Sequence, residues 1–235
     1  MRISRIALAP LAACLMVIAA SANAQVYTID VGNSAISPYS PPYATATINL
    51  VDATHANVTF ASLSHDGYVF LMGSSQGVDV NVNASSFSVS NLTWANVYSG
   101  FTDPGAGTYS VTSGNVSTFG VFNTVIDFFD GFKNTASTFS FSLTNTGGTW
   151  ASAASVLTPN ASGNSAAIHG YVCADPTCTM QAGAVATGYA SDGVTPPIPE
   201  PETYAMLLAG LTLLGFTALR RRKPDLGVRF IALPQ

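Results

Sequence analysis

Charged residues are scarce in this chain, and cationic ones are almost missing from its long middle part. Between residues 25 and 198 there are nine Asp and one Lys, with no Arg and no Glu, so this part carries a formal charge of −8. Nucleic-acid binding depends on clusters of Lys and Arg that neutralise phosphates. This composition therefore argues against nucleic acid as a partner. It leaves Ser, Thr, Asn, Gly and Ala to cover the surface.

Cysteine is equally rare, with three residues in the whole chain: Cys14, Cys173 and Cys178. Cys173 and Cys178 close a short loop, and in an oxidising compartment such a pair is most simply a disulfide. A zinc site would need further ligands, and the nearby His169 does not complete a suitable set. We predict a disulfide and no metal or cofactor.

The first 24 residues have the pattern of an export signal. Arg2 and Arg5 precede an apolar run over residues 6–20, and Ala22-Asn23-Ala24 supplies the small residues that signal peptidase requires. We predict a signal peptide over residues 1–24, with cleavage between Ala24 and Gln25.

A lipoprotein is the alternative for this end of the chain. Leu11-Ala12-Ala13-Cys14 matches the pattern in which a lipid is attached to Cys14. Only residues 6–10 of the apolar run would precede that pattern, and the run continues beyond Cys14, so the export signal is favoured.

Period-two alternation of apolar and polar residues dominates the middle part, which is typical of strands with one buried face. It occurs around Ala44 to Leu50, Val78 to Val82, Phe87 to Val89, Tyr109 to Val111 and Phe139 to Leu143. Turn-forming Gly, Pro and Asp residues separate these segments. About ten short strands at this spacing predict an antiparallel β-sandwich, with a jelly-roll-like arrangement, over residues 25–195. Residues 120–132 fit either a short amphipathic helix or a buried strand, and continuity with the next strand favours the strand.

The carboxyl-terminal part combines three features in order. Pro199-Glu200-Pro201 lies in a linker over residues 196–204, an uncharged run follows over residues 205–219, and Arg220, Arg221, Arg222 and Lys223 open a basic tail over residues 220–235. As a helix, the uncharged run would be about 22 Å long. Tyr204 and snorkelling arginines can extend it to a membrane's width. Basic residues remain cytoplasmic, so we predict a single transmembrane helix with the strand-rich domain outside.

These three features resemble the PEP-CTERM sorting signal of exopolysaccharide-producing Gram-negative bacteria. The resemblance implies that the chain is a substrate of exosortase, a membrane cysteine peptidase that cuts near the motif and releases or transfers the body. It implies an exported protein, first anchored in the inner membrane and then sorted to the cell surface or matrix. Pro199 and Pro201 keep the segment extended and accessible.

Catalytic motifs in the body are incomplete. Gly73-Ser74-Ser75-Gln76-Gly77 matches the nucleophile elbow around Ser75, but a strand is expected after it where the elbow needs a helix. The segment from Asp79 to Asn83 resembles the start of a calcium loop but lacks its Gly and Glu, and its polar side chains are expected on a solvated strand face. Asp127 and Asp130 are candidates for the two carboxyl groups that a glycosidase uses, but a domain that contains Asp and no Glu is a poor basis for this chemistry. His55, His65 and His169 have no metal-ligand spacing. We expect no enzymatic activity.

Two hypotheses for function follow. The first is a structural or adhesive protein of the exopolysaccharide matrix, with the polysaccharide or further copies of the chain as partners beside exosortase. The second is a carbohydrate-binding or polysaccharide-degrading module that uses exposed aromatic residues, for which the candidates are Tyr39, Tyr43, Trp94, Tyr98 and Trp150. Aromatic residues are more often buried in a core than exposed for ligands, which favours the first hypothesis.

Overall fold

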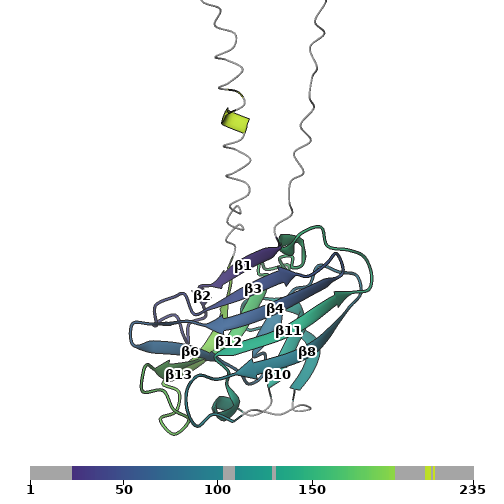
Figure 1. Cartoon of the computed structure of the whole chain (residues 1–235). Helices are drawn as coiled ribbons and strands as arrows, with labels where there is room; N and C mark the ends of the chain where they lie inside the picture. Colours follow the sequence, from purple (N-terminus) through teal and green to yellow (C-terminus); the bar gives the residue numbers. More distant parts are fainter. Residues whose placement is uncertain (1–22, 103–108, 129–130, 194–209, 213, 215–235) are drawn as a thin grey trace, which may run out of the picture. The chain divides into compact units, whose positions relative to one another are not determined.

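The structure, a computed structural model, describes residues 23–102, 109–128, 131–193, 210–212 and 214, and between residues 23 and 193 it is built almost entirely of antiparallel strands (Figure 1). These strands form two sheets that face each other, as the predicted β-sandwich requires. The finer prediction of a jelly-roll-like arrangement stays a prediction.

The first sheet has five strands and faces the viewer in Figure 1. Its order is β1 (Ala24–Ile29), β3 (Ala44–Leu50), β4 (His55–Ser62), β11 (Thr138–Asn145) and β8 (Phe87–Ala95). The alternating residues around Ala44 and Phe139 thus form β3 and β11, as predicted.

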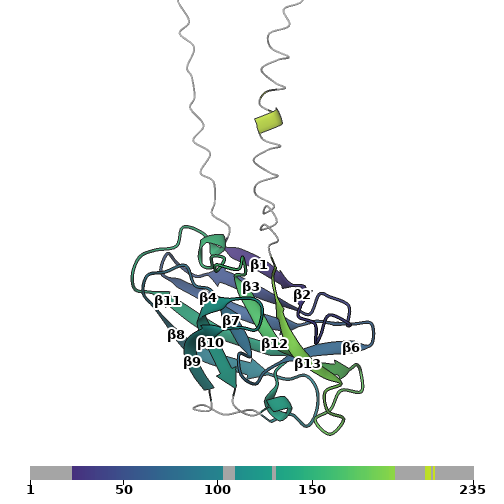
Figure 2. The same cartoon turned by 180° about the vertical axis from the view of Figure 1, so that it is seen from behind.

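The second sheet faces the viewer in Figure 2. Its main path runs through β2 (Val31–Gly32), β13 (Ala186–Ser191), β12 (Ala166–Ala174), β7 (Val78–Val80), β10 (Val121–Phe128) and β9 (Tyr109–Asn115). β6 (Tyr68–Met72) also pairs with β12, and β5 (Ser64–His65) pairs with β6. Two short 3-10 helices, η1 (Gly131–Asn134) and η2 (Ala153–Ser155), complete the described elements of this unit.

The ambiguous segment over residues 120–132 is mainly a strand. β10 pairs with β7 on one side and with β9 on the other, which places it inside the sheet. Its apolar side chains pack on both faces, because Ile126 belongs to the core between the sheets and Val125 to a cluster on the outer face. A strand buried on both faces lacks simple alternation, which explains why its residues also fitted a helical spacing.

The main core lies between the two sheets. Phe60, Phe139 and Phe141 of the first sheet meet Phe70 and Ile168 of the second, and each of these side chains is at most 2% exposed. Burying a large apolar side chain contributes about 1.5–3 kcal/mol relative to leaving it exposed. This core therefore holds the two sheets together.

A bulge in β8 explains how one strand keeps two stretches of apolar residues facing inward. Phe87 and Val89 face the core before it, and Leu92 and Trp94 face the core after it. Simple alternation from Phe87 would point Leu92 and Trp94 outward. The register with β11 shifts between Ser140 and Ser142, and Asn91 takes the left-handed conformation with φ of 54°. Such a bulge adds one residue to a strand and reverses the facing of the residues that follow.

Of the predicted transmembrane helix over residues 205–219, the structure describes residues 210–212 and 214, and these are helical. Among all described residues, no helix has the length and apolar character needed to span a bilayer. The predicted signal peptide, the Pro-Glu-Pro segment and the basic tail lie outside the described residues, apart from Asn23 and Ala24 at the end of the predicted signal peptide.

Candidate interaction surface and sorting signal

The five strands of the first sheet contain no Asp, Glu, Lys or Arg, and His55 is their one ionisable side chain apart from tyrosine. Every second residue of the inner strands points away from the core, and on the outer face these residues are almost all hydroxyl- or amide-bearing. We call this outer surface the hydroxyl face. Its members are Thr45, Thr47, Asn49, Asn57, Thr59, Ser88, Ser90, Thr93, Thr138, Ser140, Ser142 and Thr144.

Strand register places the side chains of the hydroxyl face in rows across the sheet. One row runs from Thr47 through Thr59 and Ser140 to Thr93, and the next from Asn49 through Asn57 and Ser142 to Ser90. Neighbouring strands lie about 4.8 Å apart, and side chains on one face recur about every 6.5 Å along a strand. The result is a regular array of groups that both donate and accept hydrogen bonds.

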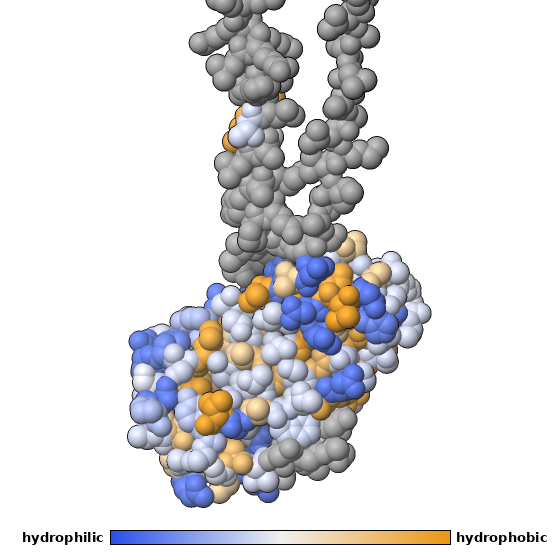
Figure 3. All heavy atoms as spheres, viewed as in Figure 1, coloured by the Kyte–Doolittle hydropathy of each residue, from blue (hydrophilic) through white to orange (hydrophobic). Residues whose placement is uncertain are grey.

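Several members of the array bond to one another and so are held in fixed positions. The hydroxyls of Thr59 and Ser140 lie 3.0 Å apart, and Ser142 Oγ donates to Asn57 Oδ1 at 2.9 Å. Thr93 and Ser90 at the edge are exposed, whereas Thr59 and Ser140 are half-buried. In Figure 3, much of this side of the molecule is pale, between the hydrophilic and hydrophobic extremes. The surface is polar yet uncharged.

The outer face of the second sheet is chemically different, because it holds a buried carboxyl. Asp79 is 1% exposed, and among the described residues neither of its carboxyl oxygens has a hydrogen-bond partner. The prediction that Asp79 lies on a solvated face is therefore wrong. Val125 and Ala167 flank it in register, and both belong to an apolar cluster with Val116 and Phe119. Burial, with a smaller effect of Asp127, raises the pKa of Asp79 well above its usual value.

Of the other catalytic candidates, Asp130 lies outside the described residues, whereas Asp127 and His169 are engaged in structural contacts. Asp127 accepts a hydrogen bond from the backbone N–H of Gln76 at 2.7 Å, and His169 Nδ1 lies 2.9 Å from the carbonyl oxygen of Ser75. Burial lowers the pKa of His169. Ser75 itself lies in the turn between β6 and β7, and a strand follows it where a nucleophile elbow needs a helix. Across the described residues, no three His, Cys, Asp or Glu side chains are grouped to hold a metal.

The aromatic residues named as possible glycan contacts are mostly part of the core. Tyr43 is 1% exposed and Trp150 is 3% exposed, and the Trp150 indole N–H donates to the carbonyl oxygen of Asn83 at 2.8 Å. Tyr39 and Trp94 are half-buried against the core. A cavity of about 160 Å³ lies beside Trp94, which is small compared with the roughly 300–1,000 Å³ of ordinary ligand pockets.

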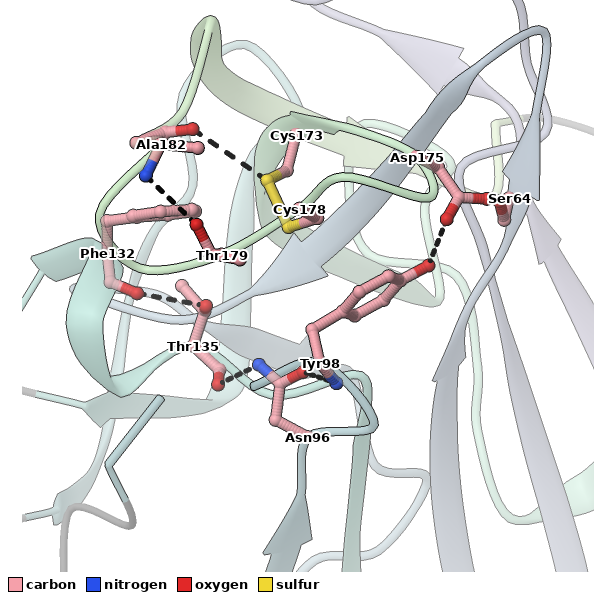
Figure 4. The surroundings of a disulfide bond; sticks show 11 residues. Ser64, Asn96, Tyr98, Phe132, Thr135, Cys173, Asp175, Cys178, Thr179 and Ala182 are labelled. Carbon is pink, nitrogen blue, oxygen red and sulfur yellow. Dashed lines mark hydrogen bonds between the residues drawn. A yellow bond between two sulfur atoms is a disulfide. The ribbon is translucent and has the colours of Figure 1, made fainter. Parts of the chain in front are cut away.

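The predicted disulfide between Cys173 and Cys178 is present and closes the loop that follows β12 (Figure 4). Asp175 in this loop accepts hydrogen bonds from Tyr98 at 2.9 Å and from Ser64. Both cysteines pack with Val69 and Leu71 of β6 in a small apolar cluster. The loop thus fastens the end of the second sheet to the segment that follows β8.

Of the other predicted site residues, Ala24 and Gln25 are the first two residues of β1. Pro199, Glu200 and Pro201 and the four basic residues from Arg220 to Lys223 lie outside the described residues. The sequence predicted only one aspect of the hydroxyl face. Alternation predicted a wet face for single strands, but nothing local predicted that these strands are neighbours.

Together, the fold and the sequence define a β-sandwich body followed by a carboxyl-terminal sorting signal. Comparison with protein families matches residues 197–223 to the PEP-CTERM protein-sorting motif. The chain therefore carries a PEP-CTERM sorting signal, and this signal supports exosortase-dependent sorting of an exported protein to the cell surface. Neither the curated proteins nor the solved structures contain a match to the chain.

Proposed function

We propose that this protein is a structural or adhesive component of the extracellular polysaccharide matrix, and that the hydroxyl face is its contact with glycan. The observation that carries the proposal is the uncharged array of hydroxyl and amide groups on the first sheet. Glycan hydroxyls can donate hydrogen bonds to such groups and can also accept hydrogen bonds from them. The proposal assigns no catalytic reaction to the body and no cofactor.

Because the five strands contain no Asp, Glu, Lys or Arg, a neutral polysaccharide is the class of ligand that fits the hydroxyl face. An acidic polymer would gain nothing from a face without Lys or Arg, and the negative body would repel it. Binding through neutral hydrogen bonds is only weakly affected by salt, whereas binding through ion pairs is screened. Retention in high salt therefore separates the two modes.

A carbohydrate-binding or polysaccharide-degrading module is the alternative. Its best structural support is the cavity beside Trp94, which Asn96 and Thr135 also line. Its small volume and the burial of Trp150 and Tyr43 favour the hydroxyl face instead.

The test uses the processed protein released by cells that contain exosortase, applied to an insoluble neutral glucan and to an acidic polysaccharide. We expect retention on the neutral polymer in about 0.5 M salt. Replacing Thr47, Thr59 and Thr93 together by Val removes three hydroxyls from one row while keeping side-chain shape. At about 0.5–1.5 kcal/mol for each hydrogen bond, this should weaken binding at least about tenfold.

Thr112→Val is the matched control, because Thr112 is exposed on β9 of the second sheet. Equal binding by the triple variant and the native protein would reject the hydroxyl face as the contact. Failure to bind any neutral polymer, or release of reducing sugar from one, would reject the proposed function itself.

A further inference from the structure

One side of the sandwich ends in two strands that have only one neighbour each in the described part of the chain. β8 is the last strand of the first sheet and pairs with β11, and β9 is the last strand of the second sheet and pairs with β10. Figure 2 shows both strands along the same side of the molecule. We call these two strands the open side.

Within the described residues, the open side has few of the features that usually prevent strand pairing between molecules. Exposed edges in native proteins are commonly short, or carry Lys or Pro. β8 has nine residues and β9 has seven, and neither contains a charged residue or a proline. The bulge at Asn91 is the one protective feature that β8 has.

The opposite side of the sandwich is protected. There the second sheet ends in β2, which has only two residues. The first sheet ends in β1, which packs against η2 and also contacts β12 and β13. The two sides of one molecule therefore differ in their capacity to accept a further strand.

Apolar side chains on the open side are incompletely buried. Phe87, Val89 and Leu92 of β8 face the core but are only partly buried, and Val111 of β9 is 39% exposed although its partner Ile126 is fully buried. On β11, one strand further in, Phe139 and Leu143 are fully buried. A further strand beside β8 would cover Phe87, Val89 and Leu92.

We propose that the open side is a self-association surface, on which β8 of one copy pairs antiparallel with β8 of a second copy. The paired molecules then share a continuous ten-stranded sheet, and their hydroxyl faces join into one surface. A second copy is the fitting partner because a two-fold contact requires a strand compatible with itself. β8 carries no charge that would repel its own copy. This inference goes beyond the proposed function and does not depend on glycan binding.

The experiment measures the mass of the processed protein in solution as its concentration rises from about 1 to 100 μM, a range that covers weak specific association. Ser90→Lys is the test variant, since Ser90 is exposed on β8 and a lysine is a natural edge blocker. Asn49→Lys is its matched control. Asn49 lies in the same cross-strand row but on β3, whose two edges are both paired.

We expect a dimer for the native protein and for Asn49→Lys, and a dissociation constant at least about tenfold higher for Ser90→Lys. Hydrogen exchange of the native protein gives a second readout that needs no variant, because β8 amides should become more protected as concentration rises. A monomer throughout, equal dimerisation of both variants, or concentration-independent exchange in β8 would overturn the proposal.

Discussion

Asp79 on β7 lies directly opposite Val125 on β10, so its carboxyl group is placed in an apolar layer on the outer face of the second sheet. Ala167 on β12 is its other partner in the sheet, and Asp127 and Tyr189 are the titratable groups that interact with it. Because no cation lies among these neighbours, the folded protein keeps this carboxyl protonated at pH values where an exposed aspartate is charged.

This burial gives the free energy of unfolding a definite pH dependence. The Asp79 carboxyl has its ordinary pKa near 3.8 in the unfolded chain and a raised pKa in the folded one. As pH rises from about 4, the unfolded state releases a proton that the folded state retains, so stability falls by up to about 1.4 kcal/mol per pH unit. Asp79→Asn should remove this contribution and raise stability at pH 7 relative to pH 4. Urea unfolding at pH 4 and pH 7 measures it, and an unchanged pH slope in the variant would contradict it.

Asp52 should show the opposite sign. This exposed carboxylate accepts hydrogen bonds from the backbone N–H groups of Thr54 and His55, and these contacts lower its pKa. Its stabilising contribution is present at neutral pH and is lost as pH falls through the folded-state pKa. Asp52→Asn should therefore reduce stability more at pH 7 than at about pH 3, because part of the contribution is already lost at the lower pH. Equal effects at both pH values would show that the contribution does not depend on charge.

Removing the disulfide should destabilise the body moderately. Cys173 and Cys178 close a short loop, for which the chain-entropy model gives about 2 kcal/mol. The double variant Cys173→Ser, Cys178→Ser should lower the unfolding midpoint in urea accordingly. Tyr98→Phe is a useful comparison, because it removes the bond to Asp175 and leaves the disulfide intact, at a cost of about 1 kcal/mol. A larger loss for Tyr98→Phe than for the cysteine pair would contradict this order.

Trp150→Phe distinguishes a core residue from a glycan contact. The substitution removes the bond to Asn83 and leaves a small cavity, so stability should fall by about 1–3 kcal/mol. Retention of the folded variant on neutral glucan should be unchanged. Loss of retention without unfolding, checked by circular dichroism, would return Trp150 to the list of ligand contacts.

The sorting motif predicts a change in the mass of the released protein. Exosortase processing through Pro199, Glu200 and Pro201 should yield a soluble form that lacks the apolar segment over residues 205–219. Replacing Glu200 and Pro201 by Ala should leave full-length protein in the membrane fraction. Intact-mass analysis with and without exosortase measures both forms. Extracellular protein that keeps the complete tail would reject processing.

The sequence predicted the strands of the first sheet well, because one face of that sheet is wet. In β3 and β11, small polar residues alternate with apolar ones throughout, and period two is then unambiguous. The disulfide was also predictable, since two cysteines so close together in an exported protein have few alternatives. The match at residues 197–223 agrees with three ordered features that the sequence presents directly.

The centre of the second sheet was harder to predict because it is buried on both faces. Asp79 alternates with Val78 and Val80, which normally indicates exposure, yet it is paired with Val125 and Ala167, which belong to an apolar cluster with Val116 and Phe119 from the turn between β9 and β10. Similarly, the bulge at Asn91 is an extra residue in β8 that can be recognised only from the pairing of β8 with β11. Contacts between strands that are distant in the chain decide which solvent-exposed faces join into one surface. Alternation within a single strand does not predict those contacts.

The unequal distribution of charge has a consequence for how concentrated protein behaves. In the described body, Asp52, Asp66 and Asp175 lie in turns, and the five strands of the first sheet are uncharged apart from His55. Repulsion between molecules therefore originates at the rims of the sandwich, while the flat first sheet offers no electrostatic barrier. Because the pKa values of Asp52 and Asp66 are lowered, these rim carboxylates stay charged on mild acidification, and they continue to keep molecules apart until the pH falls below the usual titration range of an aspartate.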